Sequence, residues 1–587
     1  MKKLMLGNEA IARGAYEARC GVVSAYPGTP STEITEYVSK YGEIYSEWAP
    51  NEKAALEAAV GASVAGARAM CAMKHVGLNV AADPLFTASY IGVNGGLVVC
   101  VADDPGMHSS QNEQDSRNYA KAAKLPMLEP SDSGECKSFL RKAFDLSEEY
   151  DTPVLLRLST RISHSRSVVE EEERADIPLK KYRADPMKYV MMPAMARRRH
   201  AIVEERMGRL AAYAEECEFN KIEYGDKKIG FICGGTTYNY AKEAFGEGAS
   251  YLKLGMTYPL PSGLIKEFAQ NVTDCYCVEE LDPFIEDFCR ALGIKIHGKE
   301  LFTPLGEYSP EMIYTRAAGA DYDPPTHVIK ETLPGRPPVM CAGCPHRATF
   351  TAIKQLGLNV CGDIGCYTLA ATPVLNSLHT CLCMGASIGM AHGMDKASPF
   401  LSEPVPKTVA VIGDSTFIHT GVAGLVNAVY NRSAITVVIL DNLTTGMTGH
   451  QDHPATGRTI KGEQTVRVDI ASLCRACGVN RVSVIDPFDL EKMKAALKEE
   501  TASDEVSVII AERPCVLLKS VAKSERNMID EHACKKCLLC MRIGCPAITR
   551  RGGGVSIDGA LCVGCGFCKK ICRFGAIVPE RRDTNEN

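Results

Sequence analysis

The sequence predicts an α/β protein with several doubly wound parallel-sheet domains and one small cysteine-rich domain at its end. Three observations support this fold class. The chain has 587 residues, too many for a single hydrophobic core. Short apolar runs alternate with helical runs over most of its length, as in parallel sheets. Eight of its 26 cysteines lie between Cys534 and Cys572, which indicates a separate small domain.

The first two domains differ in composition from the segment between them. Residues 1–165 alternate apolar and alanine-rich runs, and we expect a buried strand at 97–102 and a helix at 52–70. Residues 166–225 carry runs of like charge, which predict a solvated helical connector. Residues 226–335 alternate again and are expected to form a second α/β domain.

Proline-rich segments at 323–325 and 333–338 mark the end of the second domain. A third α/β domain is expected over residues 336–522. The last domain, residues 523–587, is short and internally repeated, and we expect its tail at 581–587 to be disordered.

The overall composition excludes several classes of protein. The chain is 45% hydrophobic and 23% charged with a net charge of −5, which gives no reason to expect nucleic-acid or membrane-surface binding. No apolar run approaches the ~18–20 residues of a membrane span. The first ten residues lack the apolar core of a secretory signal. These features predict a cytoplasmic enzyme with neither nucleic-acid nor membrane partners.

The cysteines fall into scattered and clustered groups. Scattered ones such as Cys20, Cys71, Cys217 and Cys233 lie in apolar stretches and are expected to be small core residues. A secreted disulfide scaffold would be short and would carry a signal peptide. In a cytoplasmic chain, dense clusters of cysteine indicate metal ligation.

The clustered cysteines form two runs of similar spacing. These are Cys534, Cys537, Cys540 and Cys545, followed by Cys562, Cys565, Cys568 and Cys572. Two-residue gaps let one loop place three thiolates on one side of a cluster, and a distant fourth thiolate joins the halves around the metal. A zinc ribbon is the alternative, but its cysteines come in pairs rather than triplets.

The two runs resemble the bacterial ferredoxin that holds two [4Fe–4S] clusters. The resemblance implies one cluster on Cys534, Cys537, Cys540 and Cys572, and another on Cys562, Cys565, Cys568 and Cys545. The first run departs from the pattern, because four residues precede Cys545 where three are usual. Arg573 also stands where the second run would have proline.

A second motif lies at the ends of two strands expected at 408–412 and 436–440. Asp414 and Ser415 follow the first strand, and Asn442 follows the second after Asp441. This arrangement resembles the thiamine diphosphate (TPP) motif, in which Mg²⁺ carries the diphosphate. Mg²⁺ prefers oxygen ligands in octahedral array, here Asp414, Asn442 and the Thr444 carbonyl. Open α/β sheets bind ligands at this edge. An unrelated aspartate turn is the structural alternative.

The residues after the second strand give the family resemblance. The segment DNLTTGMTGHQ at 441–451 resembles the corresponding segment of the 2-oxoacid:ferredoxin oxidoreductases. It differs from their pattern at Thr445, where they have tyrosine, and at His450, where they have glycine. Met447 lies in this segment and is expected, with Ser415, to contact the cofactor.

Three further residues take their expected roles from this resemblance. Met384 matches the bulky apolar residue that bends TPP beneath its thiazolium, although a helix-core methionine is also possible from the pattern. Glu52 matches the glutamate that TPP enzymes aim at the aminopyrimidine ring; the alternative is a helix cap. Thr29 matches a position that touches the substrate. Lys74 and His75 are candidate pocket donors by placement, and Arg117 is either functional or a surface charge.

A third cluster is implied near the cofactor. Cys341, Cys344, Cys366 and Cys515 match the proximal [4Fe–4S] ligands that the family carries in its TPP domain. Such a cluster would shorten the electron's path from the thiazolium to the ferredoxin domain. The Cys474 and Cys477 pair lacks such partners and is expected to be core.

Nearly the whole chain resembles the alpha subunits of indolepyruvate ferredoxin oxidoreductase, above all at residues 26–33, 51–79, 103–117 and 341–347. The resemblance implies oxidative decarboxylation of an arylpyruvate with coenzyme A, yielding aryl-acetyl-CoA, CO₂ and reduced ferredoxin. It also implies a smaller beta subunit in an α2β2 complex. The alternatives are the same chemistry on pyruvate, phenylpyruvate or a branched-chain oxoacid, a non-oxidative decarboxylase, or an electron-transfer subunit without TPP chemistry.

Overall fold

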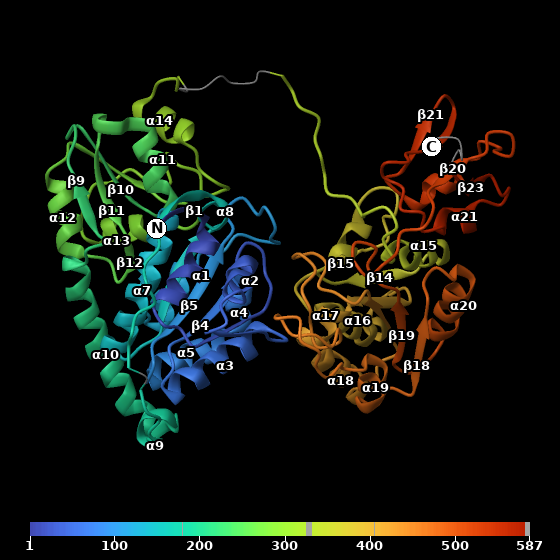
Figure 1. The fold of residues 1–587 in the computed structure, drawn as a ribbon, viewed down its shortest axis with the longest axis horizontal. Coiled ribbons are helices and arrows are strands. Elements are labelled where there is room, and N and C mark those ends of the chain that lie inside the picture. Colours follow the sequence, from blue (N-terminus) through green and yellow to red (C-terminus); the bar gives the residue numbers. More distant parts are fainter. Residues whose placement is uncertain (179, 324–330, 404, 581–587) are drawn as a thin grey trace. The chain divides into compact units, whose positions relative to one another are not determined.

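In the computed structural model the chain divides into two compact units, Met1–Glu331 and Thr332–Asn587 (Figure 1). The structure describes residues 1–178, 180–323, 331–403 and 405–580. Pro324 and Pro325 of the expected proline-rich boundary, and the tail expected to be disordered at 581–587, lie outside the described residues.

The first unit is built on a seven-stranded sheet that is parallel apart from one edge strand. Its order is β12-β6-β7-β5-β4-β2-β3. The strands are β2 (Val22–Ala25), β3 (Tyr45–Trp48), β4 (Ala69–Lys74), β5 (Leu97–Asp103), β6 (Met127–Leu128), β7 (Val154–Ser159) and the antiparallel β12 (Met256–Tyr258). The strand expected at 97–102 is confirmed as β5.

Helices cover both faces of this sheet, so its central strands β4 and β5 are fully buried. One buried cluster packs α1 (Gly7–Glu17) and α7 (Ser133–Tyr150) on one face. A separate cluster packs α3 (Glu52–Ala65) and α5 (Ala82–Ile91) on the other.

The helix expected at 52–70 is wrong at its end. Helix α3 stops at Ala65, and Gly66 follows with a φ of 110°, a left-handed cap that favours glycine. Residues 69–74 then form β4, which is fully buried. A short apolar run that is buried on both faces cannot be told from a buried helix by periodicity alone.

A second sheet of the same unit has the order β13-β10-β11-β9. Its strands are β9 (Lys221–Glu223), β10 (Ile229–Gly234), β11 (Ser250–Leu254) and β13 (Asp274–Val278), of which only β9 runs antiparallel. Strand β12 lies between β11 and β13 in the sequence, yet it pairs with β6 in the first sheet. The segment that forms the second sheet therefore also contributes a strand to the first.

The charged connector is less solvated than its composition predicts. It contains α10 (Pro193–Glu216), which buries Arg199, Val203, Arg206, Leu210 and Ala214. The guanidinium of Arg206 donates to Ser89 O and Asp151 O, at 2.9 and 2.8 Å. Arg199 pairs with the Asp151 carboxylate at 2.8 Å, so this face of the helix packs against the first domain rather than facing solvent.

The second unit contains a six-stranded, fully parallel sheet of order β15-β14-β16-β17-β19-β18. The strands are β14 (Asn359–Gly362), β15 (Thr380–Cys381), β16 (Thr408–Gly413), β17 (Thr436–Asp441), β18 (Arg481–Ile485) and β19 (Ser507–Glu512). The strands expected at 408–412 and 436–440 are confirmed as β16 and β17, each one residue longer.

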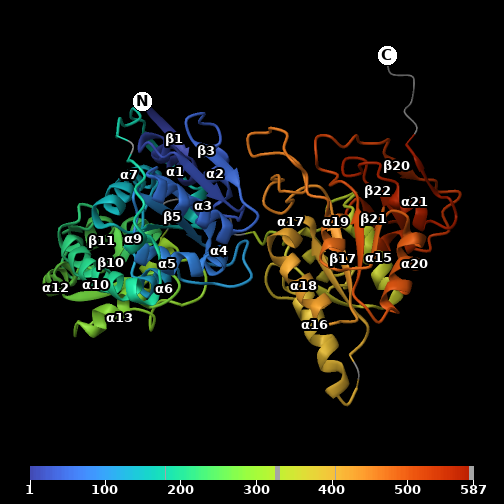
Figure 2. The ribbon, with the colours of Figure 1, turned by 90° about the horizontal axis from the view of Figure 1, so that it is seen from below.

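This sheet is also covered on both faces. Helices α15 (His346–Leu356) and α20 (Leu490–Thr501) pack on one face. Helices α16 (Ala386–Ala397), α18 (Val422–Tyr430) and α19 (Ile470–Ala476) pack on the other. Figure 2 shows β17 between α18 and α20.

The cysteine-rich end of the unit has little regular structure. Strands β20 (Asn527–Ile529) and β23 (Ile577–Pro579) pair antiparallel, as do β21 (Ile548–Arg551) and β22 (Gly554–Ile557). The remaining elements are a 3₁₀ turn at Leu539–Ile543 and α21 (Phe567–Ile571). Its apolar core is small, and Phe488 and Ala348 of the parallel-sheet domain pack into it. Within the described part of the chain, no helix has the length and apolarity needed to cross a membrane.

Candidate active site and cluster sites

Asp414 lies at the carboxyl end of β16, as the sequence predicts, and its carboxylate is held by backbone N–H groups. It is buried, and Oδ1 accepts a hydrogen bond from Ser415 N at 2.8 Å. Oδ2 accepts from Asn442 N at 3.2 Å and Leu443 N at 2.9 Å. Because β16 and β17 are parallel neighbours, their carboxyl ends bring these residues together.

Three oxygen-bearing groups meet here, the Asp414 carboxylate, the Asn442 amide and the Thr444 carbonyl. One terminal atom of the Asn442 amide lies 3.3 Å from each Asp414 carboxylate oxygen and 2.8 Å from Thr444 O. The Asn442 amide fits this position in two ways. Its nitrogen can donate to the three acceptors, or its oxygen can face them with a cation bound between. Carboxylate, amide and backbone oxygens are the ligands that Mg²⁺ prefers, so the residues fit the ion.

A second buried carboxylate increases the negative charge here. Asp441 ends β17, and burial together with the charge of Asp414 raises its pKa to about 7. Two acidic groups this close in a buried place attract positive charge, which a bound cation would supply in addition to His453, whose Nε2 lies 3.3 Å from Asp414 Oδ2.

The remaining residues expected at the cofactor lie around the same edge. Ser415 is buried, and its Oγ accepts from Thr445 Oγ1 at 3.0 Å. Thr445 N donates to Gln451 O at 3.0 Å, which closes a short loop, and Met447 lies half exposed on that loop.

The structure adds Asp363, which the sequence analysis did not identify. It is fully buried after β14, the strand beside β16. Its carboxylate accepts from Gly385 N at 2.8 Å and Ser387 N at 2.9 Å. These bonds fix the start of α16 and the neighbouring Met384. A second Gly-Asp pair at a strand end, residues 362–363, was the available signal.

Met384 is held on its other side by Thr420. The Thr420 hydroxyl donates to Met384 O at 2.8 Å. Gly385 has a φ of 83°, and a Cβ there would lie 2.0 Å from Thr420 Oγ1, so this turn requires glycine. Met384 therefore belongs to a fixed turn before α16 rather than to a helix core.

In the first unit Glu52 is the buried first residue of α3. Asn51 provides the cap, because its side chain accepts from Ala54 N at 2.8 Å. The Glu52 carboxyl instead packs on Gly77, where a Cβ would lie 2.6 Å from Glu52 Oε1. The helix-cap alternative for Glu52 is therefore wrong.

Lys74 and Thr29 lie in the same region as Glu52. Burial lowers the pKa of Lys74 to about 8, and the charges of Asp104 and Glu52 oppose that shift. Lys74 Nζ donates to Ser109 O at 2.8 Å, and Ser109 Oγ donates to Thr29 O at 3.1 Å. The carboxyl ends of β2, β3 and β4 thus bring together Thr29, Glu52 and Lys74.

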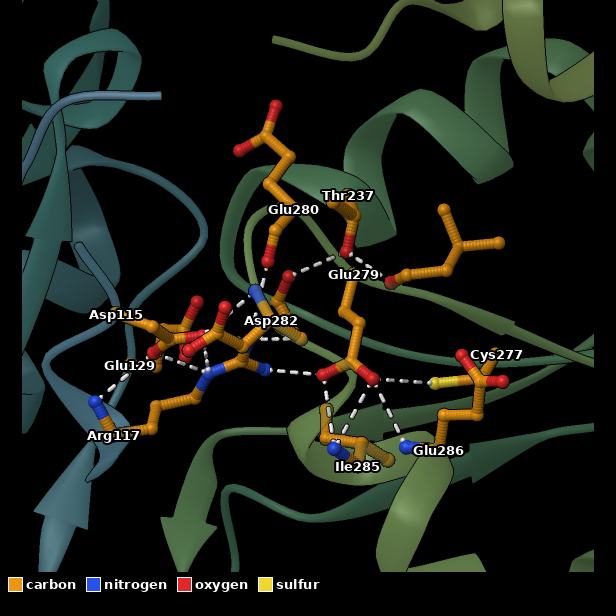
Figure 3. A network of polar contacts seen from close by, with 12 residues as sticks. Asp115, Arg117, Glu129, Thr237, Cys277, Glu279, Glu280, Asp282, Ile285 and Glu286 are labelled. Carbon is orange, nitrogen blue, oxygen red and sulfur yellow. Dashed lines mark hydrogen bonds and ion pairs between the residues drawn. The ribbon is translucent and has the colours of Figure 1, made fainter. Parts of the chain in front are cut away.

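Arg117 is buried, so its interpretation as a surface charge is wrong. Figure 3 shows its guanidinium between Asp115, at 2.5 Å, and Glu279, at 2.6 Å. Asp115 belongs to the loop that follows β5, whereas Glu279 follows β13 of the second sheet. The network therefore fixes the loop at 104–116 against the second sheet.

The cysteine-rich segment groups its thiols in two sets. Burial raises the pKa of Cys540, and the nearby thiols of Cys572, Cys537 and Cys534 raise it further. For the other set, burial raises the pKa of Cys568 to about 12, with contributions from the thiols of Cys565, Cys545 and Cys562. Each set joins one triplet to the last cysteine of the other run.

The four remaining candidate ligands also lie near one another. Burial raises the pKa of Cys366 to about 11, and the thiols of Cys515 and Cys341 contribute. Cys344 has a pKa raised to about 12, by burial and by its neighbours Cys366 and Cys341. Cys474 is buried, as expected for a core residue, and Cys477 is half-buried.

None of these sets converges on one point in the way that ligands of a single metal ion do, within the residues described. A [4Fe–4S] cube has four irons, and each thiolate binds a different one. Each set supplies the four thiols that such a cube requires.

Two family models match the chain. Residues 363–511 match "Thiamine pyrophosphate enzyme, C-terminal TPP binding domain". Residues 13–229 match "Pyruvate flavodoxin/ferredoxin oxidoreductase, thiamine diP-bdg". These ranges contain the Asp414 and Glu52 regions respectively.

Curated relatives match over nearly the full length. Indolepyruvate oxidoreductase subunit IorA of Archaeoglobus fulgidus is 43% identical, covering 99% of this chain and 98% of the relative. The protein of that name from Methanothermobacter thermautotrophicus is 40% identical, covering 99% and 97%. A solved 2-oxoglutarate:ferredoxin oxidoreductase from Magnetococcus marinus aligns with 54% of this chain and 65% of that chain, with a TM-score of 0.47 and 19% identity.

Proposed function

The chain belongs to the family of IorA subunits of indolepyruvate oxidoreductase, a 2-oxoacid:ferredoxin oxidoreductase family with TPP-binding domains, and we propose that indolepyruvate and related arylpyruvates are its substrates. The reaction is oxidative decarboxylation. The oxoacid and coenzyme A give an aryl-acetyl-CoA and CO₂, and two electrons pass to ferredoxin.

The observation that carries this proposal is the oxygen-lined site at Asp414. Asp414, Asn442 and the Thr444 carbonyl would hold Mg²⁺, and Ser415 and Met447 would contact the cofactor. TPP, when bound, supplies the carbanion chemistry that decarboxylation requires. The protein's contribution is to hold the cofactor in one conformation, which the clamped turn at Met384 supports.

Glu52 and Lys74 of the first unit would have different roles: Glu52 would act on the cofactor, and Lys74 would bind the substrate. Glu52 is buried and held against Gly77, as suits a carboxyl that holds a proton at the aminopyrimidine. Lys74 keeps its proton at neutral pH because its pKa is about 8. Its ammonium, beside Thr29, would attract the carboxylate of a 2-oxoacid.

The three thiol sets would carry the electrons. We assign one [4Fe–4S] cluster to Cys534, Cys537, Cys540 and Cys572, and a second to Cys545, Cys562, Cys565 and Cys568. A third is assigned to Cys341, Cys344, Cys366 and Cys515. An electron-transfer role alone is disfavoured, because the Asp414 site would then have no purpose.

The relatives are named as subunits, so a partner subunit is implied. We propose an α2β2 complex with a smaller beta subunit, with ferredoxin as the electron acceptor. Coenzyme A would bind as co-substrate.

The decisive experiment is anaerobic purification of the complex followed by iron, TPP and turnover analysis. We expect about twelve irons and about one TPP per chain. Among indolepyruvate, phenylpyruvate, pyruvate, 2-oxoglutarate and 2-oxoisovalerate, indolepyruvate should give the highest kcat/KM for coenzyme A-dependent dye reduction. Asp414→Ala should abolish TPP binding and turnover while the iron content stays unchanged. A preference for an aliphatic oxoacid would reject the substrate, and unchanged turnover in Asp414→Ala would reject the site.

A further inference from the structure

Arg347 is a buried cation at the second position of α15, three residues after Cys344. Only 3% of the surface of Arg347 is exposed. One terminal nitrogen donates to Ile543 O at 2.7 Å. The other donates to Met340 O at 2.8 Å and Cys341 O at 3.1 Å. The guanidinium thus joins the Cys341–Cys344 loop to the cysteine-rich segment.

The hydrogen bonds of Arg347 do not neutralise its charge. Every one of these acceptors is a neutral backbone carbonyl, and Nε has no partner among the described residues. No carboxylate of the described chain lies within 4.0 Å of the guanidinium. A buried charge without a counter-charge is strongly destabilising, whereas Arg117, equally buried, has two carboxylates.

Thiols from two different sets surround Arg347. The residues that line one pocket include Arg347, Cys344, Cys545, Cys562, Cys565 and Cys568. The two loops are in close contact, since a Cβ on Gly343 would lie 2.5 Å from Val563 Cγ2 and 3.4 Å from Cys565 Cβ.

We propose that Arg347 is a positioning residue whose counter-charge comes from two flanking sets of thiolates. One set is Cys341, Cys344, Cys366 and Cys515, and the other is Cys545, Cys562, Cys565 and Cys568. This inference rests on the cluster assignments of the proposed function. Cysteines release their protons when they bind metal, so each loaded set is anionic. A buried cation between two such sets stabilises both, and it stabilises the reduced state more because reduction adds negative charge.

The consequence is a specific electrostatic effect. Arg347 raises the reduction potentials of the flanking clusters and favours electron arrival there. The third set, Cys534, Cys537, Cys540 and Cys572, does not line this pocket, so the reduction potential of its cluster should depend much less on Arg347.

The test compares Arg347→Gln, which removes the charge, with Arg347→Lys, which keeps it. Arg542→Gln is the matched control, because it removes an exposed charge three residues before Cys545. Each variant of the full complex is titrated anaerobically, with the cluster signals followed by electron paramagnetic resonance. We expect Arg347→Gln to move at least one flanking cluster to a more negative potential. Arg347→Lys and Arg542→Gln should stay close to the unsubstituted protein.

Unchanged potentials in Arg347→Gln would overturn the proposal. If Arg347→Gln cannot retain its clusters, iron retention becomes the measurement. Retention in Arg347→Lys alone supports a role of the charge, and equal loss in both variants overturns it. Failure of the proposed function is distinguishable from failure of this inference. If the cluster assignments were wrong, the unsubstituted protein would already contain fewer than about twelve irons per chain, before any potential is measured.

Discussion

Glu52 and Gly77 show how a glycine can determine where a buried carboxyl lies, here the carboxyl for which we propose a role at the aminopyrimidine. Nothing in the sequence, neither the spacing of the two residues nor a motif that contains both, indicates that they are in contact. The match to other TPP enzymes pointed to Glu52, but only the packing shows that Gly77 limits where its carboxyl can lie.

We expect Gly77→Ala to lower kcat by about tenfold to a hundredfold, because a displaced catalytic group loses its orientation. The new methyl group would lie 2.6 Å from Glu52 Oε1 and must push the carboxyl aside. Gly61→Ala is the control, since Gly61 lies in α3 with nothing within 4 Å of its added Cβ. Steady-state kinetics and TPP titration measure both variants. Equal kcat values in the two would show that Gly77 does not position Glu52.

Other single residues illustrate the same limit. Asp363 and Asp414 each follow a glycine at a strand end, yet only Asp414 belonged to a spacing that identified it. Arg117 could not be distinguished from a surface charge, because its partner Glu279 lies 162 residues away in the sequence.

At the scale of elements, the junction of the two sheets in the first unit is a buried network of charge (Figure 3). Glu280, next to Glu279, is buried there, and its Oε1 accepts from Tyr308 N at 2.8 Å. Burial raises its pKa from 4.5 to about 7, and the charges of Glu307 and Glu129 add to the effect.

This shift makes the stability of the junction depend on pH. Between pH 4.5 and about 7 the folded state keeps the proton that the unfolded state has released. The free energy of unfolding therefore falls as pH rises through this range, by an amount on the order of 3 kcal/mol in all. Below pH 4.5 both states hold the proton, and the effect disappears.

Glu280→Gln should therefore raise the thermal midpoint at pH 8 and leave it nearly unchanged at pH 4.5. The amide cannot ionise, and its oxygen can still accept the Tyr308 N–H. Glu267→Gln, on an exposed face of α12 (Ser262–Gln270), is the control and should have little effect at either pH. Calorimetric scans at both pH values decide; an equal change at both would reject the ionisation of Glu280 as the cause.

At the scale of the whole molecule, the cysteines fall into two groups, which their spacing already separates in the sequence. All nine cysteines of the first unit are buried, as expected for core residues. The grouped thiols of the second unit surround a small apolar core, so that segment is expected to depend on its metal for folding.

Cys562→Ser should remove one cluster, leaving about eight irons per chain. The oxygen of serine is a poorer iron ligand than thiolate, and three cysteines hold a cube weakly. Cys477→Ser is the control, because this half-buried cysteine lies on the other side of the sheet and should keep about twelve irons. Iron and acid-labile sulfide analysis measures both. Full iron content in Cys562→Ser would contradict the ligand assignment.

The sequence by itself determined the fold class, the places of β16 and β17, and the family, because these depend on local periodicity and on motifs with fixed spacing. The tertiary structure decided which distant residues meet: Gly77 with Glu52, Asp363 with the Met384 turn, Arg117 with Glu279, and Arg347 with two sets of thiols. It also showed β12 joining the first sheet and α3 ending at Ala65. Burial creates these relationships, since a side chain's charge and position matter most where water cannot screen or replace its partners.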